Sequence, residues 1–209
     1  MNIDQQHDET LKTYGKIAYK WNDINPDGDH HDFVFKKFLE LLPNGHVLEI
    51  GCAAGRDSEK LTKLGYKYTG TDAVQKFIEQ ANKQYPERTF ITCKAQDIKD
   101  VFEEASFDGF WCSATLLHIP RKDIISTLQG IRKVIKNDAI GMISLQKGTK
   151  ENYEQNNKKT DGFARLFVYY TKETFEAILQ EAGFKIVFYE EIPRAERADW
   201  IHFIVKAIN

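Results

Sequence analysis

The sequence of 209 residues has no apolar run long enough to cross a bilayer, and its first nine residues are mostly polar. A membrane helix needs about 20 apolar residues, and a secretory signal needs an apolar segment of about 7–15 residues near the start. Neither pattern is present. We therefore expect a soluble, cytoplasmic protein with no membrane partner.

Cysteine is also scarce. The three cysteines, Cys52, Cys93 and Cys112, lie far apart and lack the paired spacing of zinc-binding or redox motifs. In a reducing compartment, such residues behave as small buried apolar side chains. We therefore expect free thiols and no metal site.

The sequence has no excess of positive charge either. Its 29 lysines and arginines are outnumbered by 31 acidic residues, for a formal net charge of -2. Proteins that bind nucleic acids usually present a basic surface to the phosphates. A nucleic-acid partner is therefore not expected, and the sequence does not indicate an oligomeric state.

From residue 46 onward, short β-rich runs alternate with helical patterns, which indicates parallel strands joined by helical crossovers. We expect strands at 46–50, 67–71, 89–93, 107–112, 139–146, 184–190 and 200–207, and helices at 57–64, 74–84, 98–104, 121–135 and 172–182. No helical pattern separates the last two strands, so one of them should run antiparallel. The sequence predicts an α/β fold with a doubly wound, mostly parallel seven-stranded sheet, helices on both faces and one antiparallel strand near the C-terminus.

Two amphipathic helices are predicted before the sheet, at 10–21 and 31–42. We expect a single domain in which residues 1–44 form a helical lid and residues 45–209 form the core. The segment 147–161 is polar and rich in lysine and asparagine, so a mobile loop over the strand ends is predicted there.

The most informative segment is 47–55, where an apolar strand runs into the small residues Gly51-Cys52-Ala53-Ala54-Gly55. Small residues let a ligand approach the backbone, and the carboxylate of Asp72, seventeen positions after Gly55, can accept hydrogen bonds from a ribose. The alternative is a tight turn, with Asp72 capping the next helix. The spacing of loop and carboxylate together favours the ligand. It matches a dinucleotide fingerprint poorly, because Gly55 comes one residue early.

Four segments in order, 49–55, 70–72, 95–97 and 107–112, resemble the class I S-adenosylmethionine-dependent methyltransferases, from about residue 47 to the C-terminus. The resemblance implies a Rossmann-like core and S-adenosylmethionine as the cofactor, with S-adenosylhomocysteine as the product. Ala53 replaces the middle glycine of the family's loop.

The resemblance also implies roles for individual residues. Glu49, Gly51, Ala53 and Gly55 would surround the methionine and ribose moieties, Asp72 would bind the ribose hydroxyls, Asp97 would lie beside the adenine amino group, and Ile98 would pack on the ring. Ala73 and Cys112 complete the expected cofactor site. Asp97 could instead cap a helix, a role that is compatible with the adenine contact, and Glu49 could bond only to loop amides.

Methyl transfer by in-line displacement depends mainly on holding the acceptor close to the methyl group. His118 is the candidate base, because imidazole titrates near neutrality, although it could instead pack against the turn before Pro120. The segment after the fourth strand lacks the Asn/Asp-Pro-Pro-Tyr/Phe arrangement that related enzymes use on nucleobase and glutamine nitrogens, so those acceptors are disfavoured.

Aromatic residues and an arginine are predicted to close the acceptor side of the pocket. The candidates are Tyr14, Trp21, Arg165, Tyr169 and Tyr170. An arginine among tyrosines suits an anionic acceptor, but such a stretch can also be a strand packed on the sheet edge.

The leading hypothesis is a methyltransferase acting on a small molecule, because 209 residues leave no appended domain for a macromolecule. Alternatives are a tRNA-modifying methyltransferase that uses the lysine-rich segment, and a non-catalytic module that binds S-adenosylmethionine. A nicotinamide-dependent oxidoreductase is disfavoured by the glycine spacing, and methylation of arsenic would need the cysteines to converge.

Overall fold

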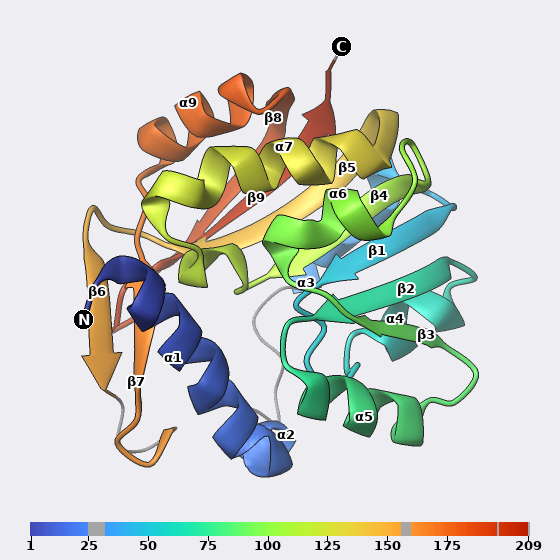
Figure 1. Ribbon diagram of the computed structural model, residues 1–209. Helices are drawn as coiled ribbons and strands as arrows, with labels where there is room; N and C mark the ends of the chain where they lie inside the picture. Colours follow the sequence, from blue (N-terminus) through green and yellow to red (C-terminus); the bar gives the residue numbers. More distant parts are fainter. Residues whose placement is uncertain (25–31, 156–159, 196, 209) are drawn as a thin grey trace.

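The computed structural model describes residues 1–24, 32–155, 160–195 and 197–208. The main sheet consists of β1 (His46–Ile50), β2 (Lys67–Asp72), β3 (Thr89–Thr92), β4 (Phe107–Ser113), β5 (Ile135–Gln146), β8 (Phe184–Ile192) and β9 (Trp200–Ala207). Its order is β3-β2-β1-β4-β5-β9-β8, and β9 runs antiparallel to both neighbours while the other pairs are parallel (Figure 1). This confirms the predicted α/β fold and its single antiparallel strand.

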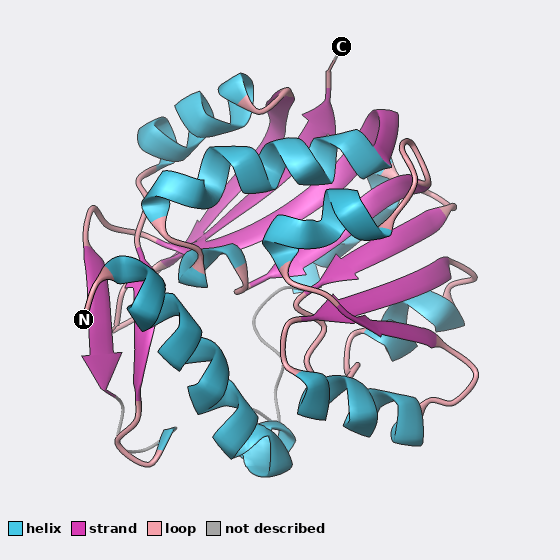
Figure 2. Ribbon diagram, in the orientation of Figure 1, coloured by secondary structure: helices cyan, strands magenta, loops and turns pink. Residues whose placement is uncertain are grey.

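Helices pack on both faces of this sheet (Figure 2). One face carries α6 (Ile98–Val101), α7 (Ile124–Val134) and α9 (Lys172–Glu181), and the other carries α3 (Asp32–Leu41), α4 (Ser58–Lys63) and α5 (Gln75–Gln84). Each helix buries its apolar side chains against the strands, which gives two separate apolar cores. None of the described helices is long and apolar enough to span a membrane.

The chain order creates a switch point between β1 and β4. From β1 the chain proceeds outward to β2 and β3, and it then returns to β4 on the opposite side of β1. In open α/β sheets a crevice forms outside the carboxyl ends of the strands at such a point. A ligand site is therefore expected beyond the ends of β1 and β4.

The N-terminal segment differs from the prediction in where its helix starts. Helix α1 spans Ile3–Ile17 and continues through the 3-10 turn η1 (Ala18–Lys20) into α2 (Trp21–Ile24). The predicted start at residue 10 was wrong, because the first turns are polar and are held by a capping box. The Asn2 side chain accepts from the Gln5 amide N–H at 2.9 Å, and the Asn2 N–H donates to the Gln5 side chain at 2.9 Å.

The predicted mobile loop at 147–161 was also wrong over part of its length. Within it, β6 (Glu151–Gln155) pairs in antiparallel fashion with β7 (Ala164–Val168), and the two form a separate small sheet. Residues 156–159 lie outside the described part. The strand β6 has no apolar alternation because its side chains are exposed or half-buried, so only its backbone pairing with β7 defines it.

Other boundaries moved by a few residues. Helix α6 ends at Val101 instead of residue 104, and β5 begins at Ile135 instead of residue 139. The predicted second helix begins in the described part at Asp32, and its first expected residue, 31, lies outside that part.

The glycine loop after β1 gives a direct test of packing. Gly51 and Gly65 both have a left-handed backbone conformation, with φ of 79° and 88°. A methyl group on Gly51 would lie 1.9 Å from Thr115 Oγ1, whereas a methyl group on Gly65 would have no described neighbouring atom within 4 Å. Gly65→Ala should therefore cost about 1–2 kcal/mol of unfolding free energy. Gly51→Ala should cost about 1–3 kcal/mol more, because of overpacking. Urea denaturation measures both, and equal losses would show that Thr115 simply moves aside.

Candidate functional site

A cavity of about 1180 Å³, its open mouth included, lies beyond the carboxyl ends of β1, β2 and β4. Its wall is made by five parts of the chain: His7, Thr10, Leu11, Tyr14 and Trp21 from the N-terminal segment; Glu49 to Ala53, Arg56 and Asp57 around the loop after β1; Asp72, Ala73, Val74 and Phe77 after β2; Cys93, Ala95 and Gln96 after β3; and Ser113, Ala114, Thr115, His118 and Ile119 after β4.

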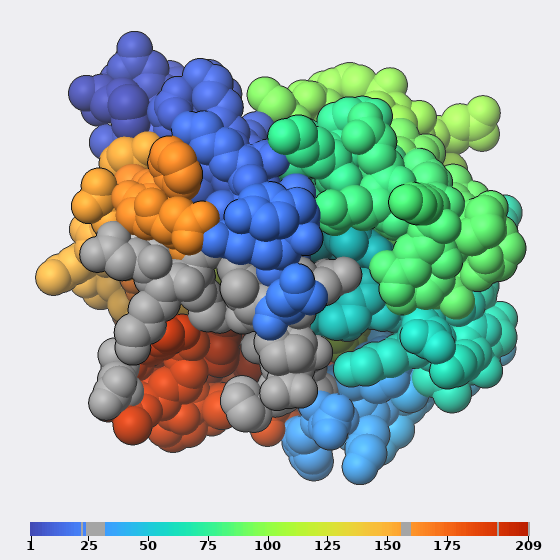
Figure 3. All heavy atoms as spheres, turned by 90° about the horizontal axis from the view of Figure 1, so that it is seen from below, coloured from blue at the N-terminus to red at the C-terminus, as the bar shows by residue number. Residues whose placement is uncertain are grey.

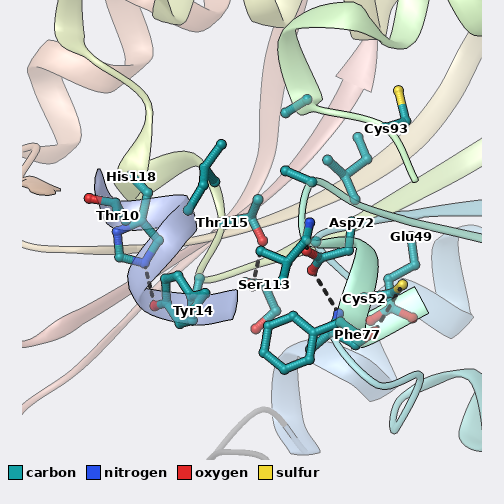
Figure 4. Close-up of a pocket in the computed structure, with 18 of the residues that line it drawn as sticks. Thr10, Tyr14, Glu49, Cys52, Asp72, Phe77, Cys93, Ser113, Thr115 and His118 are labelled. Atoms are coloured by element: carbon teal, nitrogen blue, oxygen red, sulfur yellow. Dashed lines mark hydrogen bonds between the residues drawn. The ribbon is translucent and has the colours of Figure 1, made fainter. Parts of the chain in front are cut away.

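The pocket has two distinct ends (Figure 4). Side chains of Thr10, Tyr14 and His118 gather at one end, whereas Glu49, Cys52 and Asp72 lie at the other, with Ser113 and Thr115 between them. The carboxylates of the lining are thus concentrated at the end formed by the glycine loop.

The loop after β1 is fixed by backbone hydrogen bonds. The N–H groups of Gly51 and Cys52 both donate to the Thr71 carbonyl, at 2.7 and 2.9 Å. Ala53 has a φ of 46°, a left-handed conformation that costs a residue with a Cβ about 1–2 kcal/mol. The loop tolerates this because the Ala53 N–H donates to Asp72 Oδ2 at 2.9 Å.

Asp72 bridges the loop and the helix that follows β2. Its Oδ1 accepts from the Val74 N–H at 2.8 Å, while its Oδ2 accepts from Ala53. Burial raises the pKa of Asp72 to about 6. The two backbone N–H groups favour the ionised form and so partly offset this rise. A carboxylate offers about four acceptor positions, so two remain for a ligand in the pocket.

Glu49 lies deeper, at the end of β1, where only 4% of it is exposed. Its Oε2 accepts from the Tyr68 hydroxyl. Burial, with the nearby Asp57 carboxylate, raises the pKa of Glu49 well above its usual range. The side chain therefore tends to hold a proton in this environment.

At the opposite end, a continuous chain of hydrogen bonds includes Tyr14 and His118. His118 Nδ1 lies 2.6 Å from the Leu166 carbonyl, so this nitrogen must carry the proton, and Nε2 is then an acceptor. The Tyr14 hydroxyl, 2.8 Å from Nε2, donates to it and accepts from Arg165 Nη1 at 2.7 Å. Both ring nitrogens of His118 are therefore engaged.

The His118 ring is held in its neutral form. Burial and then the positive charge of Arg165 lower the pKa of His118 to about 3, although the bond to Leu166 opposes this shift. To act as the predicted general base, His118 would need a free ring nitrogen and a pKa nearer neutrality. The geometry instead makes His118 a fixed acceptor for the Tyr14 hydroxyl.

Polar contacts attach α1 to the rest of the site. Thr10 Oγ1 accepts from the Leu166 N–H at 2.7 Å, and Thr13 Oγ1 donates to the Ala164 carbonyl at 3.0 Å. His7 Nδ1 donates to the His118 carbonyl at 2.9 Å, and its Nε2 accepts from the Gln96 amide at 3.1 Å. In Figure 3 the blue N-terminal segment accordingly lies between the orange residues of β6 and β7 and green residues from the middle of the chain.

Aromatic rings close the pocket between α1 and α5. Tyr14 meets Trp21 edge to face at a centroid distance of 5.1 Å, and both rings lie 6.3 Å from Phe77. Such edge and tilted contacts stabilise aromatic clusters. The cluster provides an apolar wall against which a flat ligand can pack.

Not every residue predicted from the sequence lines the cavity. Those that do are Tyr14, Trp21, Glu49, Gly51, Ala53, Asp72, Ala73 and His118; those that do not are Gly55, Asp97, Ile98, Cys112, Arg165, Tyr169 and Tyr170. Cys112 is fully buried in the core on the α7 face, because alternate side chains of β4 point to opposite sides and Ser113 is the one that reaches the pocket. Arg165 lies behind Tyr14, and Tyr170 is buried in the core.

The cysteines do not form a common site. Cys52 and Cys93 line the pocket, whereas Cys112 does not. Burial raises the pKa of Cys93 to about 11, that of Cys112 to about 12, and that of Cys52 well above its usual value. The reactive thiolate form is therefore disfavoured at all three, which argues against cysteine-based methylation of arsenic.

The sequence also predicted substrate contacts in the segment 112–120, where Ser113 and Thr115 line the cavity. Other lining residues were not predicted, and His7, Thr10, Phe77 and Gln96 are among them. Gln96 was within reach of sequence reasoning, since it lies between Ala95 and Asp97 in a segment already singled out. His7 and Thr10 carried no signal, because their contacts are with residues more than 80 positions away.

Residues 48–143 match the model of a family described as "Methyltransferase domain". The Ubiquinone biosynthesis O-methyltransferase of Coxiella burnetii is 33% identical over 129 residues, which cover 57% of this chain and 53% of that protein. The chain therefore spans about half the length of the curated relatives it matches.

Solved structures match over nearly the whole chain. Burkholderia thailandensis 1,6-didemethyltoxoflavin-N1-methyltransferase, with bound 1,6-didemethyltoxoflavin and S-adenosylhomocysteine, has a TM-score of 0.80 at 17% identity and covers 100% of this chain and 92% of its own. The cyclase SpnF has a TM-score of 0.74 at 13% identity and covers 94% of each chain. At these identities the likeness shows the fold alone, and the cyclase indicates that this fold serves more than one reaction.

The Tyr14 hydroxyl can be tested by removing it. Tyr14→Phe leaves His118 Nε2 and Arg165 Nη1 without their shared partner, so the free energy of unfolding should fall by about 1–3 kcal/mol. Tyr19→Phe is the matched control, since Tyr19 is 74% exposed. Urea denaturation of both variants is the measurement, and similar stabilities would contradict the assigned hydrogen bonds.

The state of His118 can be observed directly by ¹⁵N NMR. We expect a neutral ring with the proton on Nδ1 from about pH 5 to 8, because its pKa is lowered to about 3. The same shift should make stability rise between about pH 3 and 6.5, where only the unfolded chain protonates this ring. His118→Asn assigns the resonances. A titration with a midpoint near 6.5 in the wild type would show that the ring is accessible.

Proposed function

We propose that this chain, whose residues 48–143 match the model of a methyltransferase domain, transfers a methyl group from S-adenosylmethionine to a small-molecule acceptor. The observation that carries this proposal is the pocket at the switch point, with the glycine loop and Asp72 at one end and a hydrogen-bonded Tyr14 at the other. When bound, S-adenosylmethionine supplies an activated methyl group.

The residues at the loop end fit a nucleoside with an amino-acid tail. Asp72 keeps two acceptor positions free for the ribose hydroxyls, and Gly51 and Ala53 expose their backbone to the pocket. Phe77 and the residues after β3 provide surfaces for the adenine. We assign Glu49 and Ala73 to the same end, because both line the cavity.

Asp97 and Ile98 remain predicted contacts of the adenine. They would reach it through their backbone atoms or after a shift of the segment that contains them. Ile98 is fully buried, and its neighbours Ala95 and Gln96 form the wall itself. Gly55 contributes by its shape, because a methyl group there would lie 2.7 Å from the Phe90 ring.

The acceptor would occupy the space between Thr115 and Tyr14. Tyr14 is oriented by two fixed partners, so its ring and hydroxyl hold one position at the wall. We infer that His118 acts as a positioning residue for Tyr14, and that the main contribution of the protein is to hold the acceptor in line with the methyl group. The toxoflavin-precursor methyltransferase and the ubiquinone-pathway relative, whose names point to small acceptors, support this class of substrate.

The role of Asp72 gives the first test. Asp72→Ala should weaken S-adenosylhomocysteine binding by about 10- to 100-fold, since hydrogen bonds to a charged group are worth about 1.5–3 kcal/mol. Affinity in the wild type should also tighten as the pH rises through about 6, where the carboxylate ionises and becomes a better acceptor. Isothermal calorimetry at several pH values measures both effects.

Asp100→Ala is the control, because Asp100 lies on the surface in an ion pair with Lys99. It should leave binding unchanged. Binding of NADH in place of S-adenosylhomocysteine, or unaltered affinity in Asp72→Ala, would refute the proposed cofactor site.

A further inference from the structure

Arg165 is a buried cation with few partners. Only 5% of it is exposed, on the β7 strand directly behind Tyr14. Its guanidinium donates one hydrogen bond, from Nη1 to the Tyr14 hydroxyl, and its Nε is buried without a hydrogen-bond partner. Among the described residues, no carboxylate lies within ion-pair distance of it.

The nearest acidic residue along the small sheet is already engaged. Glu154 pairs opposite Arg165 in the β6–β7 register, but its Oε1 accepts from the Tyr169 hydroxyl at 2.9 Å and from Asn152 at 3.2 Å. The rings of Tyr14 and Phe167 lie 5.3 and 4.9 Å from the guanidinium and offset part of its burial. A buried charge without a counter-ion is otherwise costly.

The position of this cation is informative because of where the acids lie. The acidic side chains that line the pocket, Glu49, Asp57 and Asp72, belong to the glycine-loop end. Glu49 tends to hold a proton and Asp57 pairs with Arg56 at 3.3 Å, so Asp72 supplies the negative charge there. The opposite end presents Tyr14 (Figure 4), and the Arg165 guanidinium donates to its hydroxyl at 2.7 Å. An acceptor with a negative group would therefore be oriented with that group toward Tyr14.

We propose that the buried charge of Arg165, acting from behind the wall that Tyr14 forms, favours an acceptor that carries a carboxylate at this end of the pocket. The proposal rests on the proposed function and names its substrate class: small carboxylic acids with an apolar body that fits the Tyr14, Trp21 and Phe77 rings. One guanidinium balances one negative charge, which favours a carboxylate over a phosphate dianion.

The experiment uses the full chain saturated with S-adenosylhomocysteine and compares acids with their neutral amides by calorimetry at low salt. The probes are benzoate against benzamide, indole-3-acetate against indole-3-acetamide, and inorganic phosphate. We expect at least one acid to bind at least tenfold more tightly than its amide. Arg165→Gln should remove that preference while leaving amide binding unchanged, and Arg165→Lys should retain part of it.

Arg121→Gln is the matched control, because Arg121 also lies over a tyrosine ring, that of Tyr170 at 4.6 Å, but Tyr170 does not line the pocket, whereas the Tyr14 ring beside Arg165 does. It should keep the acid preference. If Arg165→Gln does not fold, the role of Arg165 is tested by comparing acid and amide binding in Arg165→Lys and in the wild type.

The outcomes separate the two proposals. Loss of S-adenosylhomocysteine binding in the wild type refutes the proposed function itself. If that ligand binds but acids and amides bind equally, if no probe binds, or if phosphate is preferred, the carboxylate assignment is overturned and the methyltransferase proposal stands. An acid preference that survives in Arg165→Gln overturns the role of Arg165.

Discussion

The site depends on how the backbone of one residue, Leu166, is satisfied. Its N–H donates to Thr10 on α1 and its carbonyl accepts from His118 after β4, so one residue of β7 connects three parts of the chain that are distant in sequence. The carbonyl fixes the tautomer of His118, the tautomer makes Nε2 an acceptor, and the acceptor directs the Tyr14 hydroxyl. A buried peptide group must be paired, and here that requirement determines the wall of the pocket.

The two ends of the pocket are built by different means. The loop end relies on local backbone geometry, since Gly51 to Ala53 and Asp72 lie in consecutive strand–loop units that are hydrogen-bonded to each other. The Tyr14 end is assembled from side chains of α1, η3 (Leu116–His118) and β7. The first arrangement suits a ligand shared by many proteins with this fold, and the second can vary with the acceptor while the sheet stays the same.

The same difference explains what the sequence could predict. The alternation of strands and helices and the positions of Gly51 and Asp72 follow from patterns within a few dozen residues, and these were predicted. The first turns of α1 are polar and the side chains of β6 are exposed or half-buried, so neither segment has an apolar periodic pattern. The pocket positions of His7 and Thr10 depend on partners more than 80 residues away. The family resemblance placed Cys112 in the cofactor site, but the alternation along β4 turns Ser113, and not Cys112, toward the pocket.

The buried face of α1 is largely polar, since three of its four buried residues are His7, Thr10 and Thr13, and the fourth is Ile17. Water can replace hydroxyl and imidazole hydrogen bonds with little net change in free energy. Release of this helix from β7 would expose mainly polar surface, and polar exposure contributes little or negatively to heat capacity. Release of α1 would then have a small heat-capacity change, so its enthalpy would stay nearly constant with temperature, unlike the enthalpy of exposing an apolar helix face.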